Sequence, residues 1–424
     1  MPDGGCTHDV VFAGMCCLCH QILPESFENS DLRRPGFITT SEELKVSASL
    51  LSGLDHVEQA RRVQQRQLVL ILDVDHTLVT VDLRSIPSQQ LRIRKRPGVD
   101  GFLNSMKDIC EMYVYTQATG AYAERVLRGL DPQRKIFGDP PRIFHRGNTP
   151  QGLKDLSQIL PGDASSALVV DDREDVWPPT VRGTQLFKVL PYLPFAGDPR
   201  EGLDLEGFLT GSSAIPWLQS EDGKRQRTNE PTAFCDFHWT RAADLQLQHL
   251  GDLLREIHKA VHGRAASETE GSLPCSVGLA LPARRQTTLS GCRLCLTGFR
   301  GQTSWPRRLG AEVVDSPDDA THVVVARRTE KWNRALTLER EGRVFVVHPG
   351  WLLRASVTWR KPCETRFAFP REGSCPCFLD IWYEAKGKDA ASAGFVEGGD
   401  GDFLFAAEGI ECQTGEQEDA PEKK

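Results

Sequence analysis

The sequence lacks any apolar run that approaches the roughly 20 residues of a membrane-spanning helix. Its start, MPDGGCTHDV, lacks the basic segment and apolar stretch of a secretory signal. It also lacks a positive balance of charge, because 51 Lys and Arg stand against 58 Asp and Glu, for a formal net charge of -7. We therefore expect a soluble, intracellular protein without a membrane segment, and we predict no direct contact with nucleic acid.

Hydrophobic residues are also rather few, at 39% of 424 residues, which indicates that part of the chain is linker or tail. The acidic, Gly-rich segment 390–424 accounts for the whole net charge, and we expect it to be disordered. The 13 cysteines of an intracellular protein should be thiols or metal ligands, since disulfides are rare in that compartment.

Two regions alternate β-rich runs with helical stretches, a pattern typical of α/β domains. The larger, 67–197, should hold a mainly parallel sheet, and the smaller, 289–369, a second α/β domain. Strands are expected in the larger region at 68–72, 112–116, 167–171 and 186–190.

The remaining segments are a Cys/His segment at 1–22, a helical lead-in at 40–66 capped by Thr40 or Ser41, and a connector at 198–288. Apolar residues at a spacing of three and four predict an amphipathic helix at 243–262 in the connector, and we expect its apolar stripe to pack on a neighbouring domain. The Gly/Ser/Pro/Arg-rich stretch 263–288 should be a linker.

The strongest chemical signal comes directly after the strand 68–72, where the chain reads Asp73-Val74-Asp75-His76-Thr77. Catalytic groups of open α/β sheets gather at the carboxyl ends of the strands. Two carboxylates one residue apart suit phosphoryl transfer with Mg²⁺, in which one attacks phosphorus and the other protonates the leaving oxygen. The string D-x-D-x-T is weak alone, and the alternative is a turn rich in Asp and Thr.

Further groups suited to the same chemistry follow other expected strands. Thr116 ends the second strand, Asp171 and Asp172 end a later one, and Lys154 lies between them in the sequence. A nucleophile, an acid/base, a hydroxyl, a lysine and metal-binding acids form a complete set for phosphoryl transfer.

Several segments of 68–195 resemble the Fcp/Scp branch of the haloacid-dehalogenase phosphatases, and most closely the Fcp-type enzymes: LDVDHTLV, KRPGVDGFL, YVYTQATGAYAERVLRGLDP, FGDPPRIFHRG, KDLSQILPGD, DDREDVWP and FKVLPYLPF. The Fcp-type enzymes, which associate with TFIIF, dephosphorylate the C-terminal domain (CTD) of RNA polymerase II. The resemblance implies a haloacid-dehalogenase-like fold and a nuclear protein-serine/threonine phosphatase that forms an aspartyl-phosphate. Two alternatives stay open: the same chemistry on another nuclear phosphoprotein, and a non-catalytic phosphopeptide-binding scaffold.

The resemblance also implies a role for each site residue. Asp73 is the nucleophile, Asp75 the general acid/base, Thr77 a support of the loop, Thr116 a contact of the phosphoryl oxygens and Lys154 the group that neutralises phosphate charge. Mg²⁺ is held by Asp73, Asp172 and the backbone carbonyl of Asp75, while Asp171 positions the lysine or a metal-bound water. Arg146 contacts the phosphate of the peptide.

The Cys/His segment places Cys6, His8, Cys16 and Cys19 in the pattern C-x-H…C-x-x-C, which suits a structural tetrahedral Zn²⁺ site. Cys17 and His20 are further candidates as ligands, so the spacing leaves the four open. The alternative is a set of reduced thiols without a metal.

The smaller α/β region resembles a BRCT domain through LSGCRLCLTGF, AEVVDSPDDATHVVVA, TEKWNRAL and VHPGWLLRA, with Trp351 expected in its core. The resemblance implies a phosphopeptide contact through Thr297, Gly298 and Lys331, and the alternative is an ordinary turn and a solvated helix charge. Two weaker signals remain. GKRQR at 223–227 is a candidate nuclear-import patch, although such short basic runs are common on solvated loops. The resemblance to the Fcp-type enzymes makes DFLFAAEGIE in the tail a candidate contact with TFIIF, and the alternative is a solubilising disordered end.

Overall fold

The computed structural model describes residues 5–24, 31–33, 43–81, 90–148, 153–162, 164–192, 209, 246–263, 276–299, 301–369 and 403–406. The patch GKRQR lies outside these residues. In the described part of the chain, no helix is both long and apolar enough to span a membrane. The cysteines described there are all free.

The larger α/β domain is built on a parallel sheet of five strands in the order β11-β10-β5-β8-β9. Its strands are β5 (Leu68–Leu72), β8 (Cys110–Tyr115), β9 (Ile143–Phe144), β10 (Ala167–Asp171) and β11 (Leu186–Lys188). All five residues of the central strand β5 are buried and apolar, as both faces of a parallel sheet are covered. The predicted fold class is confirmed, although β8 lies earlier than the expected 112–116 and β11 ends before residue 190.

The two faces of β5 pack against different helices because side chains alternate along a strand. Leu68, Leu70 and Leu72 share a buried cluster with residues of α2 (Val99–Met106), α3 (Gly120–Leu130) and α6 (Gln246–His262). Val69 and Ile71 belong to a second cluster with residues of α1 (Ala48–Gln64) and α4 (Pro179–Thr184). The sheet is therefore the middle layer of three.

The lead-in segment is only partly helical. Helix α1 begins at Ala48, and its N-cap is Ser47, whose hydroxyl accepts a hydrogen bond from the Leu50 amide at 3.4 Å. The prediction of a helix over 40–66 was wrong at its start, because Leu44–Ser47 forms strand β4. This strand pairs with β1 (Val10–Phe12) and β3 (Leu32–Arg33), and β2 (Met15–Cys16) completes an antiparallel sheet. Thr40 and Ser41 lie outside the described residues.

The smaller domain has a parallel sheet in the order β13-β12-β14-β15, with helices α8 (Trp305–Arg308), α9 (Glu330–Arg340) and α10 (Pro349–Thr358). Its strands are β12 (Arg293–Thr297), β13 (Glu312–Val314), β14 (His322–Val325) and β15 (Phe345–Val347). The two strands expected within 311–326 lie on either side of β12. Trp351 is fully buried and its indole donates to the Pro362 carbonyl at 3.0 Å, which confirms its place in the core.

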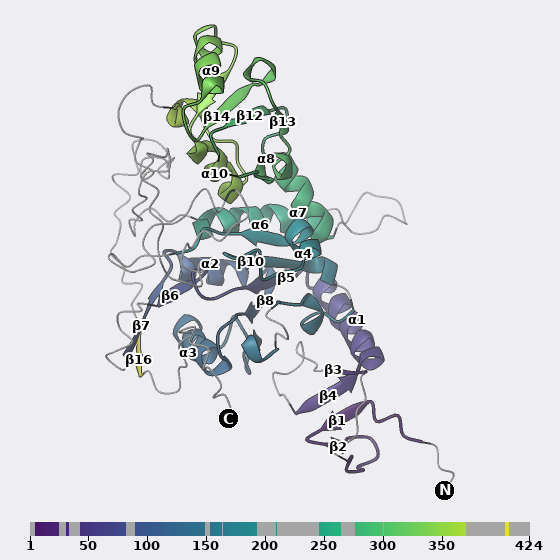
Figure 1. Ribbon diagram of the computed structural model, residues 1–424. Helices are drawn as coiled ribbons and strands as arrows, with labels where there is room; N and C mark the ends of the chain where they lie inside the picture. The colour runs from purple at the N-terminus through teal and green to yellow at the C-terminus, as the bar shows by residue number, and fades with distance from the viewer. Residues whose placement is uncertain are drawn as a thin grey trace, which may run out of the picture.

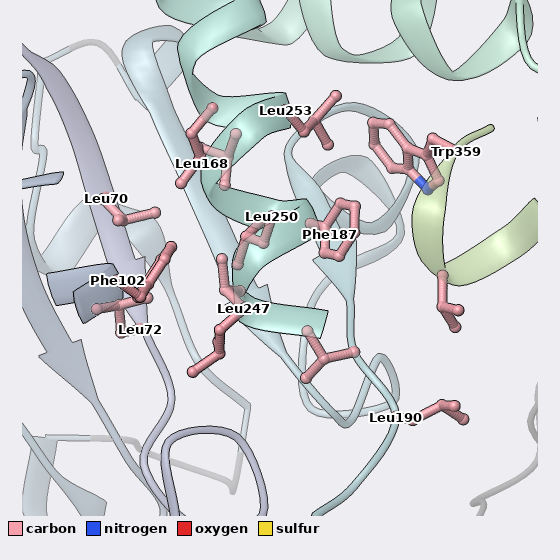
Figure 2. Packing of buried hydrophobic residues seen from close by; sticks show 14 of the residues in the cluster. Leu70, Leu72, Phe102, Leu168, Phe187, Leu190, Leu247, Leu250, Leu253 and Trp359 are labelled. Carbon is pink, nitrogen blue, oxygen red and sulfur yellow. The ribbon is translucent and has the colours of Figure 1, made fainter. Parts of the chain in front are cut away.

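The connector joins the two domains into one packed body (Figure 1). Helix α6 buries the predicted apolar stripe, and Figure 2 shows Leu247, Leu250 and Leu253 between Leu70 on one side and Phe187 with Trp359 on the other. The rings of Phe187 and Trp359 lie 4.8 Å apart. The prediction that 263–288 is a linker was wrong for its second half, because Val277–Gln286 forms helix α7, which packs on α4, α6 and α8. Residues 264–275 lie outside the described part of the chain.

A small antiparallel sheet stands beside the strand ends of the larger domain, with the order β16-β7-β6. Strands β6 (Val79–Val81) and β7 (Gln90–Lys95) follow the D-x-D-x-T segment, and β16 (Phe403–Ala406) comes from the acidic tail. The expectation of disorder over 390–424 is therefore wrong for these four tail residues, because their backbone pairs with the edge of β7. The other residues of 390–424 lie outside the described part.

Candidate active site

The D-x-D-x-T segment leaves β5 in a tight loop that places its carboxylates at the carboxyl edge of the sheet. The Asp73 amide still donates to the Val170 carbonyl of β10, at 2.9 Å. The chain then turns at His76, whose φ of 63° is in the left-handed region, and Leu78 donates to the Val74 carbonyl at 2.9 Å. Asp73 is thus anchored to the sheet while the residues after it fold back over the strand end.

Lys154 connects two of the acidic residues across the strand ends. Its ammonium lies 2.8 Å from Asp73 Oδ1 and 2.6 Å from Asp171 Oδ2, and the side chain is only 1% exposed. Burial lowers the pKa of Lys154, but Asp171 and Asp73 outweigh burial, so the pKa is raised and the lysine stays charged. A permanent positive charge thus lies between the expected nucleophile and a second buried carboxylate.

Asp73, Asp171 and Asp172 form a buried cluster in which one ligand atom from each lies within 4.8 Å of the others. Burial raises the pKa of Asp73 to about 7, with Asp171 and Asp75 adding to the rise and Lys154 opposing it. Burial, Asp171 and Asp73 raise the pKa of Asp172 well above its usual value. Burial and mutual repulsion thus oppose the ionisation of these acids, which have one lysine between them. A divalent cation would supply further positive charge and keep the carboxylates ionised, and Mg²⁺ prefers such oxygen ligands. The donor set therefore fits Mg²⁺.

An aromatic wall holds Lys154 and Asp171 in place. The Trp177 indole donates to Asp171 Oδ2 at 2.8 Å, and the lysine ammonium lies 5.4 Å from the Trp177 ring centroid and 5.8 Å from that of Tyr115. The Tyr115 hydroxyl accepts from the Asp155 amide at 3.1 Å, next to the lysine. The two rings restrict the lysine to the orientation that reaches both carboxylates.

Asp75 is not a member of the three-carboxylate cluster, although it is close enough to Asp73 to raise the pKa of that carboxyl. Tyr122 of α3 donates to Asp75 Oδ1 at 2.5 Å, which orients this carboxylate. Thr116 is buried at the end of β8, and its hydroxyl accepts from the Ala118 amide at 3.0 Å. Thr77 is buried in the turn after Asp75. The Arg146 amide donates to the Ala118 carbonyl at 3.0 Å, which brings residue 146 to the loop that follows β8.

Spacing alone did not assign a role to Arg96, Tyr122 or Trp177, although all three lie in the segments that resemble the Fcp-type enzymes. Arg96 is fully buried and donates to the carbonyls of Thr77, at 3.1 Å, and Leu190, at 3.0 Å. It also donates to Gln246 Oε1 of α6 at 2.9 Å. Arg96 therefore ties the catalytic loop to the connector helix.

The Cys/His segment gathers Cys6, His8, Cys16 and Cys19, whose ligand atoms all lie within 4.8 Å of one another. The Cys6 and Cys16 sulfurs are 3.7 Å apart, and Cys19 Sγ is 3.6 Å from His8 Nδ1. Ligands about 2.3 Å from a tetrahedral Zn²⁺ are separated by roughly 3.8 Å, so the spacing fits this ion. Cys17 and His20, the further candidates, are not members of the cluster.

In the smaller domain, Thr297 ends β12 with its side chain buried, and its hydroxyl lies 2.5 Å from that of Thr329, the N-cap of α9. Gly298 has a φ of 75°, and a Cβ there would approach the Arg327 amide nitrogen to 2.4 Å. Lys331 is exposed in the first turn of α9. The strand end and the start of α9 are thus adjacent.

Comparison with known proteins agrees with this architecture. Residues 68–219 match the family model of NLI interacting factor-like phosphatases, and residues 284–355 match that of BRCA1 C Terminus (BRCT) domains. The solved structure of Fcp1, an essential RNA polymerase II CTD phosphatase, is 26% identical with a TM-score of 0.56, and the match covers 75% of this chain and 100% of that chain.

Similar full-length proteins are the RNA polymerase II C-terminal domain phosphatases of Schizosaccharomyces pombe and Caenorhabditis elegans, each 25% identical. The matches cover 85% and 88% of this chain but 66% and 57% of those proteins. The RNA polymerase II C-terminal domain phosphatase-like 4 of Arabidopsis thaliana is 26% identical over 86% of this chain and 82% of its own length. The chain therefore combines an NLI interacting factor-like phosphatase domain with a BRCT domain, and in this combination it is similar to Fcp1 and to the RNA polymerase II C-terminal domain phosphatases.

Proposed function

We propose that this chain is an Mg²⁺-dependent protein-serine/threonine phosphatase that acts through an aspartyl-phosphate on Asp73. The observation that carries the proposal is the buried contact of Lys154 with both Asp73 and Asp171, beside Asp172, at the carboxyl edge of the sheet. A carboxylate nucleophile repels a phosphate dianion, so positive charge is needed next to it. Lys154 and the acidic site for Mg²⁺ both lie beside Asp73 and can supply that charge.

The residues divide the chemistry between them. Asp73 attacks phosphorus, and Asp75, oriented by Tyr122, gives its proton to the leaving serine oxygen and later takes one from water. Thr116, Lys154 and Arg146 receive the phosphoryl oxygens, while Thr77 supports the loop. Asp73, Asp172 and the Asp75 carbonyl would hold Mg²⁺, with Asp171 fixing Lys154. When bound, Mg²⁺ supplies positive charge against the phosphate.

The proposed substrate is the phosphorylated CTD of RNA polymerase II, and the proposed location is the nucleus. The names of the similar proteins and a match that covers the whole of the solved Fcp1 chain support this substrate. We also propose that Thr297, Gly298 and Lys331 contact a phosphopeptide and that the acidic tail contacts TFIIF.

We propose that the chain is divided into six segments, with the limits 1–22, 40–66, 67–197, 198–288, 289–369 and 390–424. Within these limits, the secondary structure differs from the sequence-based expectation at Leu44–Ser47, which is a strand, and at Val277–Gln286, which is a helix.

Phosphate release from CTD heptads phosphorylated at serine 2 or serine 5 tests the proposal. We expect release with Mg²⁺, none with EDTA, and a preference for one serine. Turnover of an aryl phosphate without turnover of heptads would move the substrate to another phosphoprotein. No turnover of either substrate, together with phosphopeptide binding, would favour the scaffold.

We propose that Cys6, His8, Cys16 and Cys19 bind a structural Zn²⁺. Cys16→Ser removes a buried ligand from the strand that pairs with β1, so we expect about one equivalent of zinc to be lost and the sheet of β1 and β4 to open. Metal analysis and proteolysis of the purified protein measure the two effects. Cys17→Ser is the matched control, since Cys17 is exposed and outside the cluster. Equal zinc content in all three proteins would contradict the assignment.

A further inference from the structure

An ion-pair network crosses from the BRCT domain to the loop that carries the metal-binding carboxylates. Glu174 lies two residues after Asp172, and its Oε2 is 3.1 Å from Arg308 Nη1, at the end of helix α8. Glu174 Oε1 lies 3.1 Å from the ammonium of Lys188, on strand β11. One carboxylate thus joins a cation from each domain.

The network is shielded from water, which makes it stronger than a surface ion pair. The side chains of Lys188, Glu174 and Arg308 are 2%, 11% and 18% exposed. Burial raises the pKa of Glu174, but Lys188 and Arg308 outweigh burial and lower it, so Glu174 is charged at neutral pH. In the described part of the chain, the hydrogen-bond partners of this buried carboxylate are Lys188 and Arg308. If Arg308 were removed, Lys188 would be left as its partner.

Arg308 is itself held firmly in the BRCT domain. Its guanidinium lies 4.4 Å from the ring centroid of Trp305, which is 1% exposed and belongs to the same helix. Its second terminal nitrogen crosses to the larger domain and donates to the Arg182 carbonyl of α4 at 3.2 Å. The domains also share the buried contact between Phe187 and Trp359. Arg308 is therefore a fixed support for Glu174.

The segment 171–177, which Glu174 anchors, includes Asp171 and Asp172 and also contacts the backbone of Lys154. Its Arg173 amide donates to Asp171 Oδ1 at 2.8 Å, and its Val176 carbonyl accepts from the Lys154 amide at 2.8 Å. On the neighbouring strand, Lys188 pairs with Asp171 in register, and the Val189 amide donates to the Asp171 carbonyl at 3.0 Å. A shift of Glu174 would move Asp171, Asp172 and the backbone of Lys154 together.

We infer that Arg308 is a positioning residue for the metal site, through which the BRCT domain holds the Asp171–Asp172 loop in its metal-binding geometry. The inference rests on the proposed Mg²⁺ site. Residues that orient metal ligands from outside typically change metal affinity by about 10- to 100-fold when replaced. The BRCT domain would thus be part of the catalytic unit, in addition to any role in binding substrate.

The test compares Arg308→Met with Arg307→Met in the whole 424-residue chain. Both changes remove one positive charge from the same short helix, but Arg307 is exposed. Mg²⁺ binding by calorimetry should weaken about 10-fold or more in Arg308→Met and stay unchanged in Arg307→Met. Arg308→Lys, which can keep one ion pair, should recover part of the affinity. Turnover of an aryl phosphate by Arg308→Met should approach that of the original enzyme as Mg²⁺ is raised.

A lower melting temperature with unchanged Mg²⁺ affinity in Arg308→Met would overturn the inference and leave Arg308 as a docking residue alone. If that variant does not fold, Glu174→Gln removes the charge at the other end with little change in shape and is read in the same way. Calorimetry measures Mg²⁺ binding directly, so this test does not require the protein to turn over a substrate. If the original protein binds Mg²⁺ but releases no phosphate, the proposed function fails while the role of Arg308 is still decided.

Discussion

Asp73→Asn is expected to lower phosphate release by at least about 1,000-fold while the protein stays folded. Asparagine keeps the shape of the side chain but cannot form an acyl phosphate, so the covalent step is lost. The acid/base and the charge-stabilising groups remain in this variant. They act together with the nucleophile, however, so little turnover is left once the nucleophile is removed. Release of phosphate from an aryl phosphate and from phosphorylated heptads, with Mg²⁺ present, measures the effect.

Asp100→Asn is a suitable control, because Asp100 is a helical acid that pairs with Lys95 at 2.9 Å outside the three-carboxylate cluster. It should keep full turnover. The melting temperature of Asp73→Asn should stay within a few degrees of that of the original protein, because the change is isosteric and Lys154 keeps its ion pair with Asp171 at 2.6 Å. Turnover above a tenth of the original rate in a folded Asp73→Asn protein would exclude Asp73 as the nucleophile.

Lys154→Met should have the second large effect, on stability as well as on turnover. The change leaves Asp73 and Asp171 buried without their shared cation, and breaking a buried ion pair from one side costs about 3–5 kcal/mol. In metal-free buffer we expect a loss of stability of this order, seen as a lower denaturant midpoint. Turnover should fall as well, since no other cation lies between these two carboxylates among the contacts that the structure gives.

The double variant Lys154→Met with Asp171→Asn separates charge from packing. If uncompensated charge causes the loss, removing one of the two acids should restore part of the stability without restoring turnover. Equal destabilisation in the single and double variants would instead assign the loss to the packing of Lys154 against Tyr115 and Trp177.

The sequence by itself determined those features that depend on residues close together in the chain, such as single strands, single helices and short motifs. The apolar run 68–72 predicted a central strand because a strand buried on both faces is apolar at every position. The acids directly after it could then be placed at the carboxyl edge of the sheet. The stripe of α6 was readable for the same reason, since a periodicity of three to four residues marks one helix face. The D-x-D-x-T loop, the two α/β domains and the family resemblance all rest on such patterns.

Only the tertiary structure decided what depends on residues far apart in the sequence. Helix α7 forms in a segment that contains Pro282 and looks like a linker, because Val277 and Leu281 are buried in the core shared by the two domains. The start of α1 was set by the pairing of β4 with β1. The contacts of Arg96 with Leu190 and Gln246, and of Glu174 with Arg308, join segments about 100 residues or more apart. Propensity and spacing describe a chain locally, whereas these partners are chosen by how the sheets and helices pack.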